Sequence, residues 1–252
     1  MKVLLHISFL GTNYCGYQVQ PNGVSVQQKL NEAAKALFGY DCNIVGCSRT
    51  DSGVHANEFC VAVSKKGESF LDTEIPVEKL ARAMSHYLPN DISVWKAEAV
   101  EDDFHPRYDV RYKEYVYKIW NGETRDPFLE GRAWHCPRRI DDAAVEQMEL
   151  AAKKLLGKKD FASFMASDTK IKDTVRTIFD AGVKKEGQLI EFHVSADGFL
   201  YNMVRIIMGT LVDVAYGKIS ADDIDGIIEA KDRRAAGTTA PPQGLYLNRV
   251  VY

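Results

Sequence analysis

Two charged side chains, Arg49 and Asp51, lie two residues apart in segment 46–53, which has a glycine at each end. Apolar runs on either side, at 42–45 and 59–63, predict two strands. Glycines at both ends allow the backbone to turn sharply and to approach a partner closely. A carboxylate and a guanidinium on such a loop can present a charged nucleophile or base at the edge of a sheet. The alternative is an Arg–Asp ion pair that only stabilises the turn.

Cysteine and histidine residues around this loop raise the alternative of a zinc site. The set Cys42, Cys47, His55 and Cys60 has suitable ligand types, but its spacings match no common zinc finger or knuckle. Cys42 and Cys47 are also an odd number of residues apart, so on one strand their side chains would face opposite sides. The five cysteines form an odd set without a Cys-x-x-Cys motif, which is typical of reduced thiols. We therefore expect no metal and a cytoplasmic protein.

The tripeptide Asp51-Ser52-Gly53 also matches the Asp-Ser/Thr-Gly motif of aspartic proteases. Those enzymes need two such aspartates that share a proton. This chain has a single copy, and Arg49-Thr50 precede it in place of apolar residues. The protease class is therefore disfavoured.

Charge is unevenly distributed along the chain, whose net charge is −3. Between Phe104 and Arg139, eight Lys or Arg residues stand against five Asp or Glu residues. A second basic region follows, made of Lys153, Lys154, Lys158, Lys159, Lys170, Lys172 and Arg176. An acid-rich stretch at 220–232 is separate from both in the sequence. This pattern allows a molecule with one positive side, as a nucleic-acid partner would need, although each cluster alone is more often a solvated face.

The first hundred residues predict the order strand–helix–strand–strand–helix–strand. Residues 2–10 form the first strand, and no apolar run is long enough for a membrane span. Ser25 and Gln28 suggest a capping box at the start of a helix that stops at Gly39. A second helix opens at Pro76. This order is a split βαβ pattern with an antiparallel or mixed sheet.

The second half also alternates strands and helices. It contains a predicted hairpin at 174–184 and 188–196, a helix carrying Arg205 near its N-terminal end, and a closing strand at 245–252. We expect two domains, residues 1–103 with the charged loop and residues 104–252 with the Arg205 helix.

One strand of the second half alternates aromatic residues with cations. Tyr115, Tyr117 and Ile119 share one face, and Lys118 lies on the other. Stacking on a nucleobase requires a flat ring, and phosphates require positive charge, so such a strand suits a nucleobase platform. The alternative is that aromatic residues simply favour strands.

Residues 46–56, GCSRTDSGVHA, resemble the catalytic motif of the TruA-type tRNA pseudouridine synthases, Gly-x-x-Arg-Thr-Asp-x-Gly-Val-His-Ala. Further matches follow in the family's order: Asp-Asp-Phe-His at 102–105, Tyr115, Asn-Met-Val-Arg at 202–205 and Gly-Leu-Tyr-Leu at 244–247. The departures are Cys47-Ser48 within the motif, and Tyr17 where the family usually has Trp.

The resemblance implies an α+β (α/β mixed) pseudouridine-synthase fold: two related split-βαβ halves, similar to RRM or ferredoxin-like units, with a large, mainly antiparallel sheet flanked by helices. It implies an isomerase that converts uridine to pseudouridine at positions 38, 39 and 40 of the tRNA anticodon stem-loop. It also implies a homodimer that needs no metal or organic cofactor. The alternative is a non-catalytic RNA-binding protein on the same fold, which loss of Asp51 or Arg49 would have favoured.

Five residues receive roles from this resemblance. Asp51 is the expected nucleophile, and Arg49 is expected to guide the flipped base or to fill the gap that it leaves. Tyr115 is expected to stack on uracil, and Leu245 to close the pocket behind it. Arg205 is expected to pair with Asp51 and keep it ionised and oriented.

Overall fold

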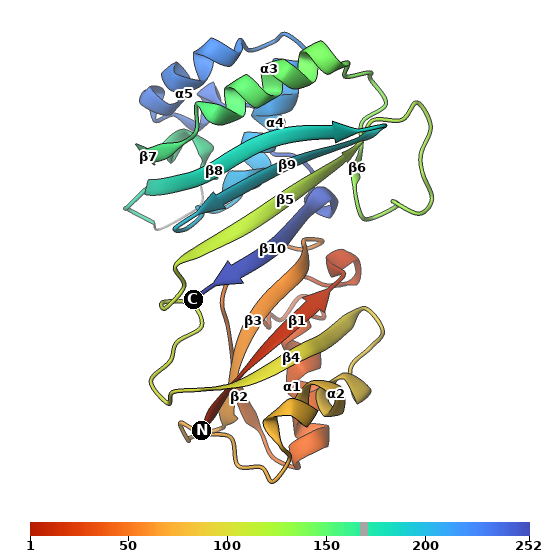
Figure 1. Ribbon diagram of the computed structural model, residues 1–252, viewed down its shortest axis with the longest axis vertical. Helices are drawn as coiled ribbons and strands as arrows, with labels where there is room; N and C mark the ends of the chain where they lie inside the picture. Colours follow the sequence, from red (N-terminus) through yellow and green to blue (C-terminus); the bar gives the residue numbers. More distant parts are fainter. Residues whose placement is uncertain (167–170) are drawn as a thin grey trace. The chain divides into compact units, whose positions relative to one another are not determined.

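The computed structural model describes residues 1–166 and 171–252 and divides the chain into two compact units (Figure 1). The first contains Met1–Arg111 and Tyr246–Tyr252, and the second contains Tyr112–Leu245. The sequence-based boundary lay after residue 103. The first unit extends past it because the Arg111 amide donates to the Val251 carbonyl at 2.8 Å, and the Tyr252 hydroxyl donates to the Pro106 carbonyl, also at 2.8 Å.

The first unit follows the predicted order of strands and helices. Its elements are β1 (Lys2–Phe9), α1 (Val26–Phe38), β2 (Cys42–Gly46), β3 (His55–Lys65), α2 (Val77–His86), β4 (Ile92–Val100) and, from the end of the chain, β10 (Leu245–Val251). Strands β4, β1 and β3 are antiparallel neighbours, and β2 pairs antiparallel with β3. Strand β10 pairs parallel with β3, which places Tyr246 opposite His55. The last strand of the chain therefore lies beside the strand that follows the charged loop.

Helix α1 begins and ends at the predicted residues. The Ser25 hydroxyl accepts from the Gln28 amide at 3.2 Å, and Gly39 adopts a φ of 78° beyond the last turn. Only half of the predicted capping box forms. The Gln28 side chain donates to Glu32 at 2.9 Å and does not reach back to the Ser25 backbone. Helix α2 starts one residue later than predicted, with Pro76 as its N-cap.

The strands of the second unit are hydrogen-bonded in the order β5-β9-β8-β7, with β6 paired to β5. Its strands are β5 (Tyr112–Trp120), β6 (Trp134–His135), β7 (Gly157–Asp160), β8 (Val175–Glu186) and β9 (Leu189–Ala196), and its helices are α3 (Asp142–Lys153), α4 (Met203–Ala215) and α5 (Ile224–Ala230). The predicted hairpin and the Arg205 helix are confirmed. Strands β6 and β7 were missed because they are only two and four residues long and lack alternating apolar residues.

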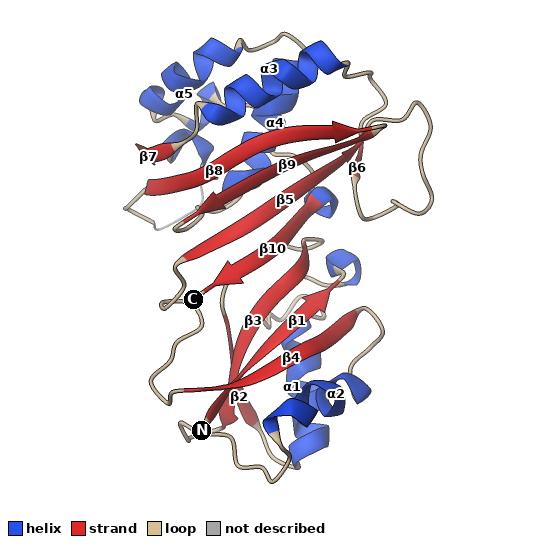
Figure 2. Cartoon of the chain, viewed as in Figure 1, coloured by secondary structure: helices blue, strands red, loops and turns tan. Residues whose placement is uncertain are grey.

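The chain has a mixed α/β fold in which mainly antiparallel strands are flanked by helices, as Figure 2 shows. In the first unit, α2 packs on β4 and α1 on β2; in the second, α3 packs on β8 and on α4. None of the helices in residues 1–166 and 171–252 has the length and apolarity needed to span a membrane.

Candidate active site

The charged loop, residues 47–54, connects β2 to β3 and is fixed by its own backbone. The Cys47 amide donates to the Cys60 carbonyl at 2.9 Å and so extends the β2–β3 ladder by one residue. A tight turn follows, in which the Val54 amide donates to the Asp51 carbonyl at 3.2 Å. Gly53 has a φ of 81°, as the third residue of a type II turn requires. Asp51 is therefore the first residue of a defined turn.

A second loop, residues 11–17, holds the charged loop in place. The Tyr14 carbonyl accepts from the Ser52 hydroxyl at 3.2 Å and from the Gly53 amide at 3.4 Å. The Tyr17 amide donates to the Thr50 carbonyl at 3.3 Å. These bonds act on the residues on both sides of Asp51 and so help to fix its backbone position.

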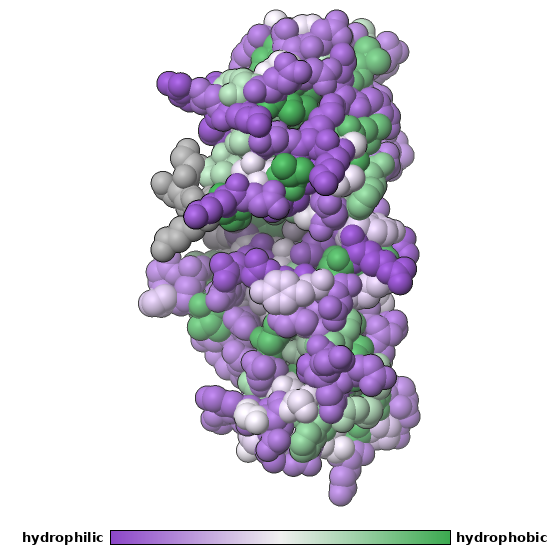
Figure 3. Space-filling model, turned by 90° about the vertical axis from the view of Figure 1, so that its left-hand side faces the viewer, coloured by the Kyte–Doolittle hydropathy of each residue, from purple (hydrophilic) through white to green (hydrophobic). Residues whose placement is uncertain are grey.

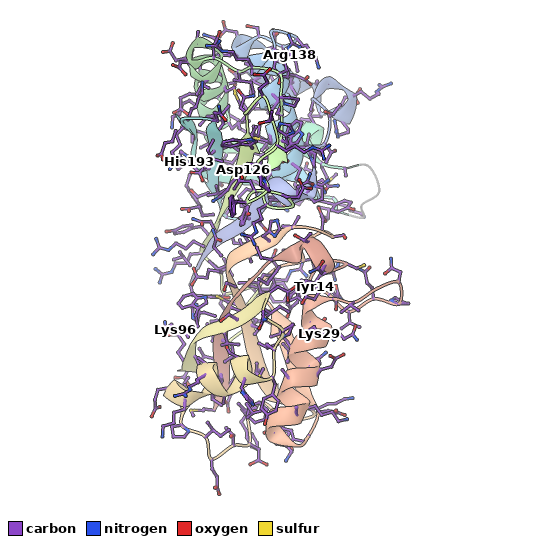
Figure 4. The ribbon with its side chains drawn as sticks, turned by 90° about the vertical axis from the view of Figure 1, so that its right-hand side faces the viewer. Tyr14, Lys29, Lys96, Asp126, Arg138 and His193 are labelled. Carbon is purple, nitrogen blue, oxygen red and sulfur yellow. The ribbon has the colours of Figure 1, made fainter. Side chains whose placement is uncertain are left out.

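Tyr14 connects this second loop to the start of β4. Its buried hydroxyl donates to the Asp91 carboxylate at 2.6 Å, and Figure 4 labels this side chain within the first unit. Burial, with the Asp91 carboxylate beside it, raises the pKa of Tyr14 above its usual range. The hydroxyl therefore remains a donor, and its bond to a carboxylate is of the stronger, charge-assisted kind. Sequence reasoning missed this brace, because nothing near Tyr14 in the chain points to Asp91.

His55 is fully buried behind the loop. Its Nδ1 accepts from the Gly11 amide at 2.9 Å, so a neutral ring carries its proton on Nε2. The ring packs against that of Tyr246, with centroids 4.6 Å apart. His55 thus helps to join the loop after β1, the start of β3 and β10.

The two charged residues of the motif differ in exposure. Arg49 is exposed, whereas Asp51 is half-buried. An exposed guanidinium can reach toward a large polyanion, and a half-buried carboxylate is partly shielded from water while it remains accessible. The structure thus brings Arg49 and Asp51 together on one short loop.

Tyr17, which departs from the family's usual Trp, lies under the loop. Its ring stacks on Phe59 with centroids 4.3 Å apart, and Gly46 leaves room for it. Its buried hydroxyl has no hydrogen-bond partner among the described residues. The ring therefore serves as packing, and its hydroxyl adds no visible bond to the site.

Tyr115 lies on β5 in the second unit, where it pairs with Val194 of β9. Its buried ring meets the ring of Phe199 edge-on, with centroids 4.9 Å apart and an interplanar angle of 79°. An edge-on neighbour fixes the ring plane without covering both of its faces. The contact of Phe199 with Tyr115 was not predicted from the sequence, because it depends on tertiary structure.

Tyr117, two residues further along β5, belongs to the core and not to a platform. It is fully buried, and its hydroxyl donates to the Pro241 carbonyl at 2.6 Å. Gly244, in the short 3₁₀ turn Pro242–Gly244, packs on the Tyr117 ring. Leu245 follows directly and is buried at the start of β10. Tyr117 therefore positions the turn that leads to Leu245.

Arg205 lies in the first turn of α4 and is half-buried. Its Nε donates to the Ala240 carbonyl at 2.8 Å, and its Nη1 donates to the Asn202 side chain at 2.8 Å. Asn202, the N-cap, has a φ of 60°, which is uncommon outside glycine. A cation at a helix N-terminus opposes the helix dipole, so helix stability alone does not favour Arg205 there. The role of Asn202 in aiming Arg205 was not predicted, since a left-handed residue leaves no pattern in the sequence.

The second basic region is partly neutralised by acidic side chains. Lys154 pairs with Asp222 at 3.3 Å and with Asp225 at 3.4 Å, and Lys159 pairs with Asp225 at 3.1 Å. The acid-rich stretch thus lies against these lysines, although it is distant in the chain. Lys170 lies outside the described residues. Hydrophilic residues nevertheless cover most of the face seen in Figure 3.

The predicted site residues fall into two groups, each placed within its own unit. Arg49 and Asp51 lie on the loop of the first unit; Tyr115, Arg205 and Leu245 lie in the second. The pairing of Asp51 with Arg205 joins the two groups and stays a prediction.

Comparison with known proteins shows a match to the tRNA pseudouridine synthase family over residues 6–109 and 151–252. Relatives called tRNA pseudouridine synthase A are 44% identical in Thermoanaerobacter sp. (strain X514), 41% in Acetivibrio thermocellus and 44% in Bacillus licheniformis, and each match covers 100% of this chain and 99% of the relative. These matches favour the enzyme over both the aspartic protease and the non-catalytic RNA-binding protein. The chain belongs to the TruA-type tRNA pseudouridine synthases, a family of isomerases.

Proposed function

We propose that this enzyme isomerises uridines 38, 39 and 40 in the anticodon stem-loop of tRNA, with Asp51 as the catalytic nucleophile. The observation that supports this most is the place of Asp51, half-buried at the head of a turn that backbone bonds hold from both sides. The reaction breaks the N1–C1′ bond of uridine, turns the base and joins C5 to C1′. A carboxylate of fixed position can attack the nucleoside or assist the loss of the C5 proton.

A uridine within a stem must leave the base stack before this chemistry can occur. Exposed Arg49, two residues before Asp51, is suited to guide the flipped base or to occupy the gap in the stack. Tyr115, with its ring plane fixed by Phe199, is the proposed stacking partner of uracil, and Leu245 closes the pocket behind it.

Arg205→Met is expected to lower turnover about 100-fold while tRNA affinity changes less than about threefold, since one charge that orients the nucleophile is lost. Single-turnover rates and filter-binding affinities measure the two effects. Arg233→Met is the matched control, because Arg233 also donates to backbone carbonyls, that of Gly237 at 2.8 Å among them, in the same unit. Equal losses of turnover and affinity in Arg205→Met would contradict its pairing with Asp51.

Tyr115→Leu is expected to lower activity about tenfold or more, because stacking on a base contributes about 1–3 kcal/mol. Tyr115→Phe keeps the flat ring and is expected to retain nearly full activity. The measurement is kcat/KM on an anticodon stem-loop substrate. Full activity in Tyr115→Leu would remove the stacking role.

We further propose that the enzyme is a homodimer that binds one tRNA and that it acts in the cytoplasm. Both points come from the family resemblance, and the free state of all five cysteines is compatible with a reducing compartment. Sedimentation of the purified protein with and without tRNA tests the oligomeric state.

The positions are tested with tRNA transcripts labelled as [5-³H]uridine, because joining C5 to C1′ releases the C5 hydrogen to water. Three transcripts keep a single anticodon-arm uridine, at position 38, 39 or 40, and a fourth has cytidine at all three. Tritium release from the first three alone is expected. Equal release from the fourth would contradict the proposed positions while leaving the reaction itself established.

A further inference from the structure

Four polar side chains gather on one face of the first unit's sheet, around the central strand β1. His6 of β1 is the direct cross-strand partner of Cys60 on β3. Glu58 lies two residues from Cys60 and therefore on the same face. Glu98 of β4 reaches the same histidine from the other side, from a position opposite Leu4. The reaction proposed above uses none of these residues.

The potential donor atoms of three of them converge. The His6 Nδ1 lies 2.9 Å from Glu58 Oε1 and 3.6 Å from Cys60 Sγ. All three ligand atoms lie within 4.8 Å of one another. Imidazole, thiolate and carboxylate are the three side-chain ligands that zinc takes in proteins.

The two separations measured from His6 Nδ1 are close to those of a tetrahedral metal ion. Bonds of about 2.3 Å to sulfur and about 2.0 Å to nitrogen, at a tetrahedral angle, separate the two ligand atoms by about 3.6 Å. The Nδ1–Sγ distance is 3.6 Å without any movement. Nitrogen and oxygen ligands on one such ion are about 3.3 Å apart, so Glu58 needs to withdraw from its 2.9 Å hydrogen bond by a few tenths of an ångström.

A second layer of contacts orients the ligands as metal sites require. His6 Nε2 lies 2.9 Å from Glu98 Oε1, the carboxylate–histidine arrangement that fixes a metal-binding imidazole. The other oxygen of Glu98 pairs with Lys96 of β4, labelled in Figure 4, at 2.6 Å. Glu58 Oε2 accepts from the Val250 amide at 3.2 Å, which leaves its Oε1 directed at His6.

Charge balance favours a bound cation in this buried cluster. Cys60 is fully buried and His6 is 6% exposed, and the Trp95 ring lies 5.1 Å from the His6 ring. A divalent ion balances the Cys60 thiolate and the Glu58 carboxylate, and Lys96 balances Glu98. The loaded cluster therefore places no net charge in the protein interior.

We propose that His6 Nδ1, Glu58 Oε1 and Cys60 Sγ form a binding site for one Zn²⁺ ion, with Glu98 as the residue that orients His6. On binding, the Cys60 thiol and the His6 Nδ1–H that faces Glu58 each release a proton to solvent, His6 keeps a proton on Nε2 toward Glu98, and water takes the remaining coordination position. The ion links β1 to β3 and, through the Glu58–Val250 bond, to β10. Its role is structural and does not depend on the proposed reaction.

This set differs from the one weighed in the sequence. There, Cys60 was grouped with Cys42, Cys47 and His55, but His55 Nδ1 is occupied by the Gly11 amide. His6 and Glu98 are far from Cys60 in the chain, and strand pairing alone brings them together.

The test is the zinc content and zinc affinity of the full-length protein after chelator treatment and loading with zinc chloride. Wild type is expected to retain one Zn²⁺ per chain through gel filtration. Cys60→Ser is expected to lose at least about 100-fold in affinity, and Glu98→Gln about 10- to 100-fold, the usual loss for an outer-shell partner. Cys42→Ser, which removes a half-buried thiol of β2 outside the cluster, is expected to bind as wild type does. Equal zinc retention by wild type and Cys60→Ser, or none by wild type, would overturn the site.

Cobalt provides a second readout on the unaltered chain. Co²⁺ added to the metal-free wild type is expected to give a thiolate-to-cobalt absorption band in the near ultraviolet, which zinc then removes. The band should persist in Cys42→Ser. Its absence from folded wild type would also overturn the site, and this measurement remains decisive if Cys60→Ser does not fold.

Discussion

Asp51→Asn is expected to lower turnover by about 10⁴-fold or more and to change tRNA affinity less than about threefold, since it removes the proposed nucleophile and keeps the shape of the side chain. The turn itself should survive, because the Val54 amide donates to the Asp51 backbone carbonyl, which the substitution keeps. Single-turnover tritium release and filter binding measure the two quantities.

Ser52→Ala is the matched control for this substitution. Ser52 is the next residue, and its hydroxyl donates to the Tyr14 carbonyl at 3.2 Å, so the change tests whether loss of a loop bond alone reduces activity. We expect a loss below about tenfold, in line with about 1 kcal/mol for one hydrogen bond. Turnover by Asp51→Asn within tenfold of wild type would make Asp51 a turn residue only.

Gly16→Ala is expected to destabilise the protein by more than about 3 kcal/mol, the sum of left-handed strain and a backbone clash. Gly16 has a φ of 78°, and an added Cβ would overlap the Thr50 carbonyl oxygen. Because Thr50 precedes Asp51, relief of this clash displaces Asp51, the proposed nucleophile, and we expect turnover by the folded fraction to fall about 100-fold.

Gly39→Ala separates the two contributions. Gly39 has the same φ of 78°, but no atom lies within 4 Å of an added Cβ. The Gly39→Ala variant should have a free energy of unfolding lower by only about 1–2 kcal/mol, the cost of the left-handed conformation, and should retain full turnover. Urea denaturation and single-turnover rates of the two variants provide the comparison. Equal losses in both would show that the approach of Gly16 to Thr50 does not position the loop.

Local patterns predicted most of the elements and the loop that carries Asp51. Helix α1 is identifiable because Ser25 and Gly39 act on their immediate neighbours. The β8–β9 hairpin is identifiable because its turn and its alternation lie within one stretch of sequence. Both signals depend on contacts between residues close in the chain.

Contacts between residues far apart in the chain were not predictable from the same patterns. The brace from Tyr14 to Asp91 and the pairing of β10 with β3 each join segments separated by many residues. The sequence could not show that Lys159 of the second basic region is neutralised, because its partner Asp225 lies beside it only in the folded chain. The roles proposed for Arg49, Tyr115, Leu245 and Arg205 come from the family resemblance, because residue spacing alone does not assign them.

The pairing of β10 with β3 determines the order in which the protein can be completed during translation. Residues 246–252 leave the ribosome after the whole of 112–245, although they belong to the first unit. The uninterrupted second unit can therefore fold as soon as it emerges, whereas the unit that carries Asp51 stays incomplete until β10 arrives. Nascent chains without β10 would leave the edge of β3 next to His55 unpaired, so synthesis passes through a stage at which this edge is available to chaperones or to other chains.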